Sequence, residues 1–224
     1  MIHQGTKEWK EQRVGKFTAS TFGDCMGTGR VSNRAFTLPG YRLIQEKVAE
    51  KLTGEQKEIT GKALDWGTEH EDEAVELYKK TTGENVEEAA FCPLAGYEDD
   101  AGGSPDGLVM ETPTLVKGII EVKCPWDSAN HIETLETGTI PAKYRVKYLT
   151  QMQFNMWATG TDFCDFVSYD PRMKSDGHKI VVERILRDEE YIAKIKEKLD
   201  RAIFEAKGQL AMIEIRTKSG RTQT

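Results

Sequence analysis

Two spacings of apolar residues alternate along the chain and predict helices towards its two ends with strands between them. A spacing of three and four residues marks amphipathic helices, whereas alternation marks strands that bury one face. Capping residues, glycine and proline set the ends of the segments. Within residues 6–26 the pattern predicts a short helix, a turn at Gly15 and a second helix that opens at Thr18 or Ser20. Further helices are predicted at 40–52, Leu64–Lys80, Pro141–Gly160 and Asp188–Ala211.

A cluster of strands is predicted between these helices. Residues 107–110 and 115–123 have the pattern of a hairpin, and Cys124-Pro125 ends its second strand because proline cannot continue a central ladder. The other predicted strands are Val86–Phe91, Phe163–Tyr169 and Lys179–Ile185. This order predicts an α/β fold, a mixed sheet flanked by helices, in one domain over residues 1–216 followed by a polar, frayed tail over residues 217–224.

Length and composition narrow the class of protein. A chain of 224 residues can bury one sizeable core, and no apolar run reaches the roughly 20 residues that cross a bilayer. The N-terminus lacks the charged start and apolar stretch of a signal peptide, so we expect a soluble, cytoplasmic protein. The four cysteines have no zinc-site spacing and are expected to be reduced thiols.

The most informative polar residues lie in and before the predicted hairpin. Side chains alternate along a strand, so Glu121 and Lys123 share one face, opposite the apolar Ile120 and Val122. Asp106 starts the neighbouring strand and can approach that face. Converging carboxylates bind a hard cation such as Mg²⁺, which activates a water beside a phosphate, while Lys123 would stabilise the developing charge. The same three residues also fit a salt-bridged hairpin.

A fourth carboxylate lies on the apolar side of a predicted helix. Glu71 shares a helix face with Ala74, Val75 and Tyr78. A carboxylate in that position needs a partner, which a metal ion could provide. It could equally lie at the rim of the apolar stripe and reach solvent.

Three more polar residues have both a functional and an ordinary interpretation. Gln151 lies on the helix face of Tyr148 and Asn155, which suits a phosphate-lined cleft or a half-exposed helix. Arg13 offers a forked clamp for a phosphate, and Ser20 lies at a helix start where backbone amides favour an anion. They could also be an exposed arginine and a simple N-cap.

The formal net charge of −6 counts against a simple basic DNA-binding module. It does not count against a nuclease, because a metal site needs clustered carboxylates and a local basic surface can coexist with a negative total. Acidic residues crowd residues 69–76, whereas basic residues collect at 143–147 and 172–174.

Several longer segments, spread over roughly residues 9 to 182, indicate a family. They are Trp9…Arg13-Val14-Gly15…Thr18-Ala19-Ser20, Lys62–Gly67 with Glu71, Ser104–Gly107, Glu121–Pro125, Gln151–Gln153 with Met156-Trp157, and Tyr169–Lys174. Together and in this order they resemble the phage lambda exonuclease family of YqaJ-like viral recombinases. Two stretches depart from the family pattern: the glycine-rich basic loop Gly27–Arg34 has no clear counterpart, and Ser128-Ala129-Asn130 stands where the family has a further basic residue.

The resemblance implies a fold and an activity. The fold is the restriction-endonuclease-like core of PD-(D/E)XK nucleases. The activity is Mg²⁺-dependent, processive 5′→3′ degradation of one strand of linear double-stranded DNA, with two Mg²⁺ ions per site that Mn²⁺ can replace. The resemblance further implies a homotrimeric ring around DNA ends, a single-strand-annealing recombinase as partner, and a phage or prophage origin in a bacterial cytoplasm.

The resemblance also implies roles for individual residues, carried over by position. Asp106, Glu121 and the backbone carbonyl of Val122 are implied as metal ligands, with Lys123 as the catalytic lysine and Glu71 near the second metal ion. Leu64 is implied as an apolar wedge in the duplex end. The implied pocket for a 5′-phosphate consists of Arg13, Ser20, Ser104 and Gln151.

Three other functions remain open at this stage. A restriction-type endonuclease could use the same core and would cut closed circles. An iron–sulfur nuclease would need clustered cysteines, and the four in this chain are scattered. A non-catalytic DNA-end-binding recombination module would have no use for Asp106, Glu121 and Lys123 together.

Overall fold

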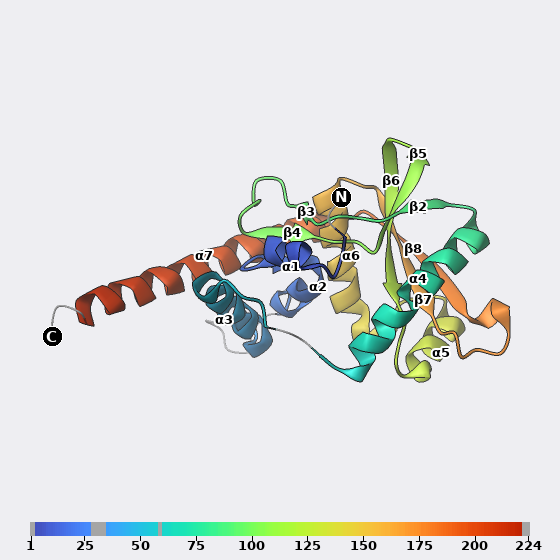
Figure 1. Ribbon diagram of the computed structural model, residues 1–224, viewed down its shortest axis with the longest axis horizontal. Coiled ribbons are helices and arrows are strands. Elements are labelled where there is room, and N and C mark those ends of the chain that lie inside the picture. Colours follow the sequence, from blue (N-terminus) through green and yellow to red (C-terminus); the bar gives the residue numbers. More distant parts are fainter. Residues whose placement is uncertain (1–2, 28–34, 58–59, 221–224) are drawn as a thin grey trace.

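A five-stranded mixed sheet with helices on both faces organises the structure (Figure 1). The computed structural model describes residues 3–27, 35–57 and 60–220. The predicted fold class is confirmed, since the sheet combines one parallel and three antiparallel pairings. In spatial order the strands are β2 (Asn85–Glu87), β5 (Gly107–Thr112), β6 (Leu115–Lys123), β7 (Phe163–Tyr169) and β8 (Ile180–Leu186).

The register of the central strand β6 leaves one of its edges unpaired near the end of the strand. On one side β6 pairs with β5, where Gly107 lies opposite Ile120, and on the other it runs parallel to β7. Because β5 begins at Gly107, the last residues of β6 extend past the start of β5 while β7 still pairs with them through Lys123. The β5-side edge of residues 121–123 is therefore open to side chains.

Two helices cover opposite faces of this sheet. Helix α4 (Lys62–Thr82) packs through Ala74 and Tyr78 onto a buried cluster that contains Ile120 and Val122. Helix α6 (Arg145–Thr159) packs through Met152 and Met156 onto a cluster that contains Ile119. Alternation along β6 thus directs Ile120 and Val122 towards α4, and Glu121 towards α6.

A second, smaller layer carries the N-terminal segments. Its sheet has the order β1-β4-β3 and packs with several helices into a separate core that includes Phe22, Ile44, Phe154 and Leu199. Helix α7 projects from the body, with the C-terminus at its far end (Figure 1). The elements are α1 (Lys7–Arg13), β1 (Phe17–Thr18), α2 (Ala19–Phe22), a 3₁₀ turn (Gly23–Cys25), α3 (Leu38–Thr53), β3 (Cys92–Pro93), β4 (Ala101–Gly103) and α7 (Glu189–Gly220).

The structure confirms the predicted long helices and the hairpin and corrects other segments. The predicted strand Val86–Phe91 ends at Glu87, and Pro141 is followed by a 3₁₀ turn (Ala142–Tyr144) before α6 begins. Helix α5 (Ser128–Thr137), a 3₁₀ turn (Asp176–His178) and the short strands of the smaller sheet were not predicted. Helix α7 continues past Ala211 to Gly220, so the expected frayed tail is helical where described; residues 221–224 and 28–34 lie outside the described residues.

Candidate active site

Asp106 is fixed at the open edge of β6. Its backbone N–H donates to the carbonyl of Ile120 at 3.1 Å, and its Oδ2 accepts from the backbone N–H of Val122 at 2.7 Å. The N–H and C=O of one strand residue point to the same edge. The Val122 carbonyl therefore faces the same side of β6 as the Asp106 carboxylate.

Glu121 and Lys123 meet on the α6 face of the sheet. Glu121 is fully buried, and the Lys123 ammonium donates to its Oε1. Its Oε2 accepts from Asn155 Nδ2 of α6 at 3.2 Å. The Lys123 ammonium also lies 5.3 Å from the centre of the Tyr148 ring, so the lysine is held between a carboxylate and an aromatic face.

The third carboxylate, Glu71, comes from α4. Its charge interacts with Asp106, Lys123 and Glu121, so the four groups share one electrostatic environment. Burial raises the pKa of Glu121, of Asp106 and of Glu71, and the neighbouring Asp106 raises the pKa of both glutamates further. Burial opposes the charge of Lys123, but Glu121 and Asp106 outweigh it and raise the lysine pKa. Three carboxylates thus face a single ammonium.

The donor set suits a hard divalent cation. Asp106, Glu121 and the Val122 carbonyl offer oxygen atoms, the ligands that Mg²⁺ prefers. An added positive charge would offset the repulsion that raises these carboxylate pKa values. In the described part of the chain, no three acidic, histidine or cysteine side chains are already gathered closely enough to hold a metal ion. The Lys123 ammonium is hydrogen-bonded to one of the two Glu121 carboxylate oxygens.

A cleft of about 1180 Å³ joins the Asp106 and Glu71 carboxylates to the predicted phosphate pocket. Arg13 Nη1 donates to Ser104 Oγ at 3.1 Å and Nη2 to Ser20 Oγ at 3.3 Å. Its guanidinium lies 4.1 Å from the Trp9 ring centre, and burial lowers its pKa to about 10, which leaves it charged at neutral pH. The predicted residues that line this cleft are Arg13, Ser20, Leu64, Glu71, Ser104, Asp106 and Gln151.

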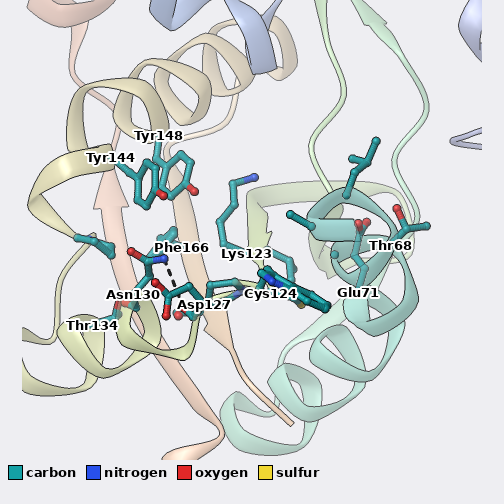
Figure 2. Close-up of a pocket in the computed structure, with 18 residues that line it drawn as sticks. Thr68, Glu71, Lys123, Cys124, Asp127, Asn130, Thr134, Tyr144, Tyr148 and Phe166 are labelled. Carbon is teal, nitrogen blue, oxygen red and sulfur yellow. Dashed lines mark hydrogen bonds between the residues drawn. The ribbon is translucent and has the colours of Figure 1, made fainter. Parts of the chain in front are cut away.

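A second pocket of about 490 Å³ is lined by Glu71, Val122 and Lys123. Figure 2 shows Lys123 extending into it between the stacked rings of Tyr144 and Tyr148 and the helix that carries Glu71 and Thr68. Leu64, which is 51% exposed, lines both this pocket and the cleft. Every predicted site residue except Glu121 therefore lines one of these two adjoining hollows, and Glu121 contacts Lys123, which lines the smaller one.

Sequence reasoning missed Trp126, which lines the second pocket and is 50% exposed. Its signal was its position directly after Cys124-Pro125, at the exit of the functional strand. Asn130, from the stretch that departs from the family pattern, lines the same pocket. The four cysteines are free thiols, and three of them lie in different buried clusters.

The mixed sheet, with a hairpin that presents acidic residues and a lysine beside a cleft that contains Arg13, defines a restriction-endonuclease-like fold. The alkaline exonuclease LHK-Exo from Laribacter hongkongensis has this architecture over 96% of this chain and 99% of its own, with a TM-score of 0.81 and 33% identity. Its complex with dAMP gives a TM-score of 0.82 and 34% identity. This chain belongs to the YqaJ-like viral recombinase family, whose model matches residues 8–162.

Two further comparisons are more restricted. A phage-related exonuclease from Haemophilus somnus 129PT has a TM-score of 0.69 and 21% identity over 88% of this chain and 96% of its own, which shows the fold alone. The uncharacterised Escherichia coli (strain K12) protein ExoD is 40% identical over 63 residues, which are 26% of this chain and 72% of ExoD. No helix among the described residues is long and apolar enough to span a membrane.

Proposed function

We propose that this chain is a Mg²⁺-dependent exonuclease that degrades one strand of linear double-stranded DNA in the 5′→3′ direction. The observation that carries the proposal is the grouping of Asp106, Glu121 and Lys123 at the end of β6, with Asp106 in the same cleft as Arg13. The named relatives support it, because LHK-Exo is an alkaline exonuclease and binds dAMP.

The residues divide the work between binding and chemistry. Arg13, with Ser20, Ser104 and Gln151, would bind the 5′-terminal phosphate and so fix which phosphodiester reaches the carboxylates. Leu64, exposed where the two hollows adjoin, would separate the bases at the duplex end. Lys123 would stabilise the negative charge that develops on the attacked phosphate.

Asp106, Glu121 and the Val122 carbonyl would hold one metal ion, with Glu71 near a second. When bound, Mg²⁺ supplies the Lewis acid that activates water and neutralises phosphate charge, and Mn²⁺ could replace it. A water oxygen would form the new bond to phosphorus as the bond to the 3′-oxygen breaks. Each cut would then leave a 5′-phosphate for Arg13 to bind.

The same proposal extends to assembly and biological setting. A homotrimeric ring around the DNA would keep the enzyme on its substrate and make digestion processive. The remaining 3′ single strand would pass to a single-strand-annealing recombinase in the bacterial cytoplasm during phage-type recombination. Family membership supports this setting.

The first experiment measures nucleotide release from linear duplex with and without Mg²⁺. We expect Mg²⁺-dependent release from linear DNA and none from closed circular plasmid. Lys123→Ala should reduce cleavage by at least about 10²-fold while DNA binding persists, because its charge acts on the reacting phosphate. The matched control is Lys117→Ala on the same strand, whose ammonium pairs with Glu84 at 2.7 Å.

The alternatives give different results in this experiment. Cutting of the closed circle would indicate a restriction-type endonuclease. DNA-end binding without cleavage in either metal would indicate a non-catalytic recombination module. Full activity of Lys123→Ala would refute the role of the lysine.

A further inference from the structure

The smaller pocket has aromatic walls that the proposed function leaves without a role. It lies beside Lys123 and Glu71, whereas Arg13 lines only the larger cleft. A strand whose 5′-phosphate binds Arg13 and whose next phosphodiester reaches the carboxylates must continue beyond them. The volume of the smaller pocket, about 490 Å³, is in the range of pockets that hold small organic groups, roughly 300–1,000 Å³.

One wall of this pocket is Trp126. Half of its surface is exposed, although large aromatic side chains are usually covered. Its ring and that of Trp66 form an edge-to-face pair, with ring centres 5.7 Å apart and planes at 83°. Trp66 therefore limits how the exposed ring can turn.

Arg172 holds the backbone beneath this ring. Its Nη1 donates to the Trp126 carbonyl at 3.0 Å, and its Nη2 donates to the Pro125 carbonyl at 2.9 Å. The guanidinium also lies 4.5 Å from the centre of the Trp66 ring. Arg172, from the Tyr169–Lys174 segment, thus fixes the backbone that follows β6 and contacts Trp66, the ring that packs against Trp126.

Arg172 is itself fixed by a buried carboxylate. Its Nε donates to Asp170 Oδ1 at 2.8 Å and its Nη2 to Oδ2 at 2.9 Å, and Asp170 is fully buried. A forked pair of this kind constrains both distance and orientation. The Asp170–Arg172 pair in the Tyr169–Lys174 segment therefore fixes the position of the Trp126 backbone.

The other aromatic wall comes from the start of α6. The rings of Tyr144 and Tyr148 are stacked, with centres 5.2 Å apart and planes at 16°, and Tyr148 continues the stack onto Phe166. Figure 2 shows the two tyrosine rings side by side next to the Lys123 side chain. Both tyrosines line the pocket.

We propose that this pocket holds the nucleobase on the 3′ side of the phosphodiester being cut, stacked on Trp126, with Arg172 as the positioning residue. The proposal rests on the exonuclease function proposed above. Stacking on an aromatic face is available to every base, so such a pocket orients a strand without selecting its sequence. An enzyme that removes successive nucleotides needs that tolerance.

The kinetic test uses 5′-phosphorylated duplexes whose second nucleotide is either intact or abasic. For release of the first nucleotide, Trp126→Ala should raise KM on the intact substrate by roughly 5- to 150-fold, with a smaller change in kcat. On the abasic substrate, wild type and Trp126→Ala should have the same KM. Trp126→Phe retains a stacking face and should behave nearly as wild type.

Two outcomes of this experiment overturn the proposal. An equal effect of Trp126→Ala on both substrates would mean that the ring does not act through that base, and so would an unchanged KM on the intact substrate. Leu115→Ala, which removes a similarly exposed apolar side chain at the hairpin end, is the matched control and should leave both KM values unchanged. If Trp126→Ala does not fold, Trp126→Leu and Trp126→Phe give the same comparison.

The role of Arg172 has its own readout. Arg172→Lys keeps a positive charge beside Asp170 but cannot bind both backbone carbonyls. It should reduce the difference in KM between intact and abasic substrates. An unchanged difference would refute its positioning role.

A binding measurement separates this proposal from the proposed nuclease function. The tryptophan fluorescence of the wild type minus that of Trp126→Phe gives the signal of Trp126. A 5′-phosphorylated oligonucleotide without Mg²⁺ should quench this difference signal, and an oligonucleotide abasic at its second position should not. Quenching in a protein without nuclease activity would refute the nuclease function and retain the stacking site. Nuclease activity without quenching would refute the stacking site and retain the nuclease function.

Discussion

The environment of Glu121 shows how one residue can be costly for folding and useful for function. A buried carboxylate needs compensating partners, and Lys123 and Asn155 each take one of its oxygens. Its pKa is nevertheless raised by burial first and by Asp106 next. Such a group retains a strong demand for positive charge, which a divalent cation would meet.

Arg13 provides a prediction at the same scale. Arg13→Ala should slow digestion of 5′-phosphorylated ends by roughly 10- to 150-fold, the loss expected for a hydrogen bond to a charged group. Ends that carry a 5′-hydroxyl should be affected much less. Initial rates on the two kinds of end measure the effect.

The control for Arg13 is Arg42→Ala, which removes an exposed arginine paired with Glu46 at 3.2 Å. It should leave both rates unchanged. Equal losses on both kinds of end in Arg13→Ala would show that the guanidinium does not recognise the terminal phosphate.

A buried ion pair whose carboxylate interacts with the Arg13 charge gives a stability prediction. Lys47 Nζ lies 2.8 Å from Glu50 Oε1, and Glu50 Oε2 accepts from the backbone N–H of Gly15 at 2.8 Å. Lys47→Met would leave Glu50 buried without its cation. The free energy of unfolding in urea should fall by about 3–5 kcal/mol.

Arg42→Met serves as the comparison on the same helix, because its pair with Glu46 is exposed. Its cost should be about 0–1 kcal/mol. Similar losses for the two variants would mean that burial of the Lys47–Glu50 pair has no special weight.

Between elements, the contact of β4 with α6 links stability to the site. A side chain at Gly103 would overlap the Asn155 oxygen and meet Ala158 at 3.4 Å. Gly103→Ala should therefore displace Asn155 from Glu121 and cost about 1–3 kcal/mol in stability through overpacking. Nuclease activity should also fall at a temperature where the variant is folded.

Gly177→Ala is the matched control, because nothing lies within 4 Å of the added carbon. Its stability should change by no more than about 0.5 kcal/mol. The link to Glu121 fails if Gly103→Ala loses stability but keeps full activity.

Element prediction from the sequence succeeded where periodicity was long and failed where strands were short. Helices α3 and α4 have long amphipathic patterns and clear glycine ends, Gly54 and Gly83. Strands β1 and β3 have two residues each, too few for any period to show. Their conformation follows from pairing with β4.

On the scale of the whole molecule, the proposed trimer is directly measurable. Sedimentation should give a mass about three times that of the 25.3 kDa chain. Digestion that has begun on labelled linear duplex should continue after excess unlabelled DNA is added, because a closed ring does not dissociate from its strand. A monomeric mass together with immediate arrest by the competitor would contradict the ring.

The sequence by itself determined the long helices, the hairpin, and the sharing of one strand face by Glu121 and Lys123, since periodicity and alternation are local properties. Only the tertiary structure decided that β5 starts opposite Ile120 and leaves the Val122 amide free for Asp106. It also decided that Arg172 reaches Trp126, 46 positions away. Contacts of this kind depend on strand register and on helices packing from both faces of the sheet, which no local pattern encodes.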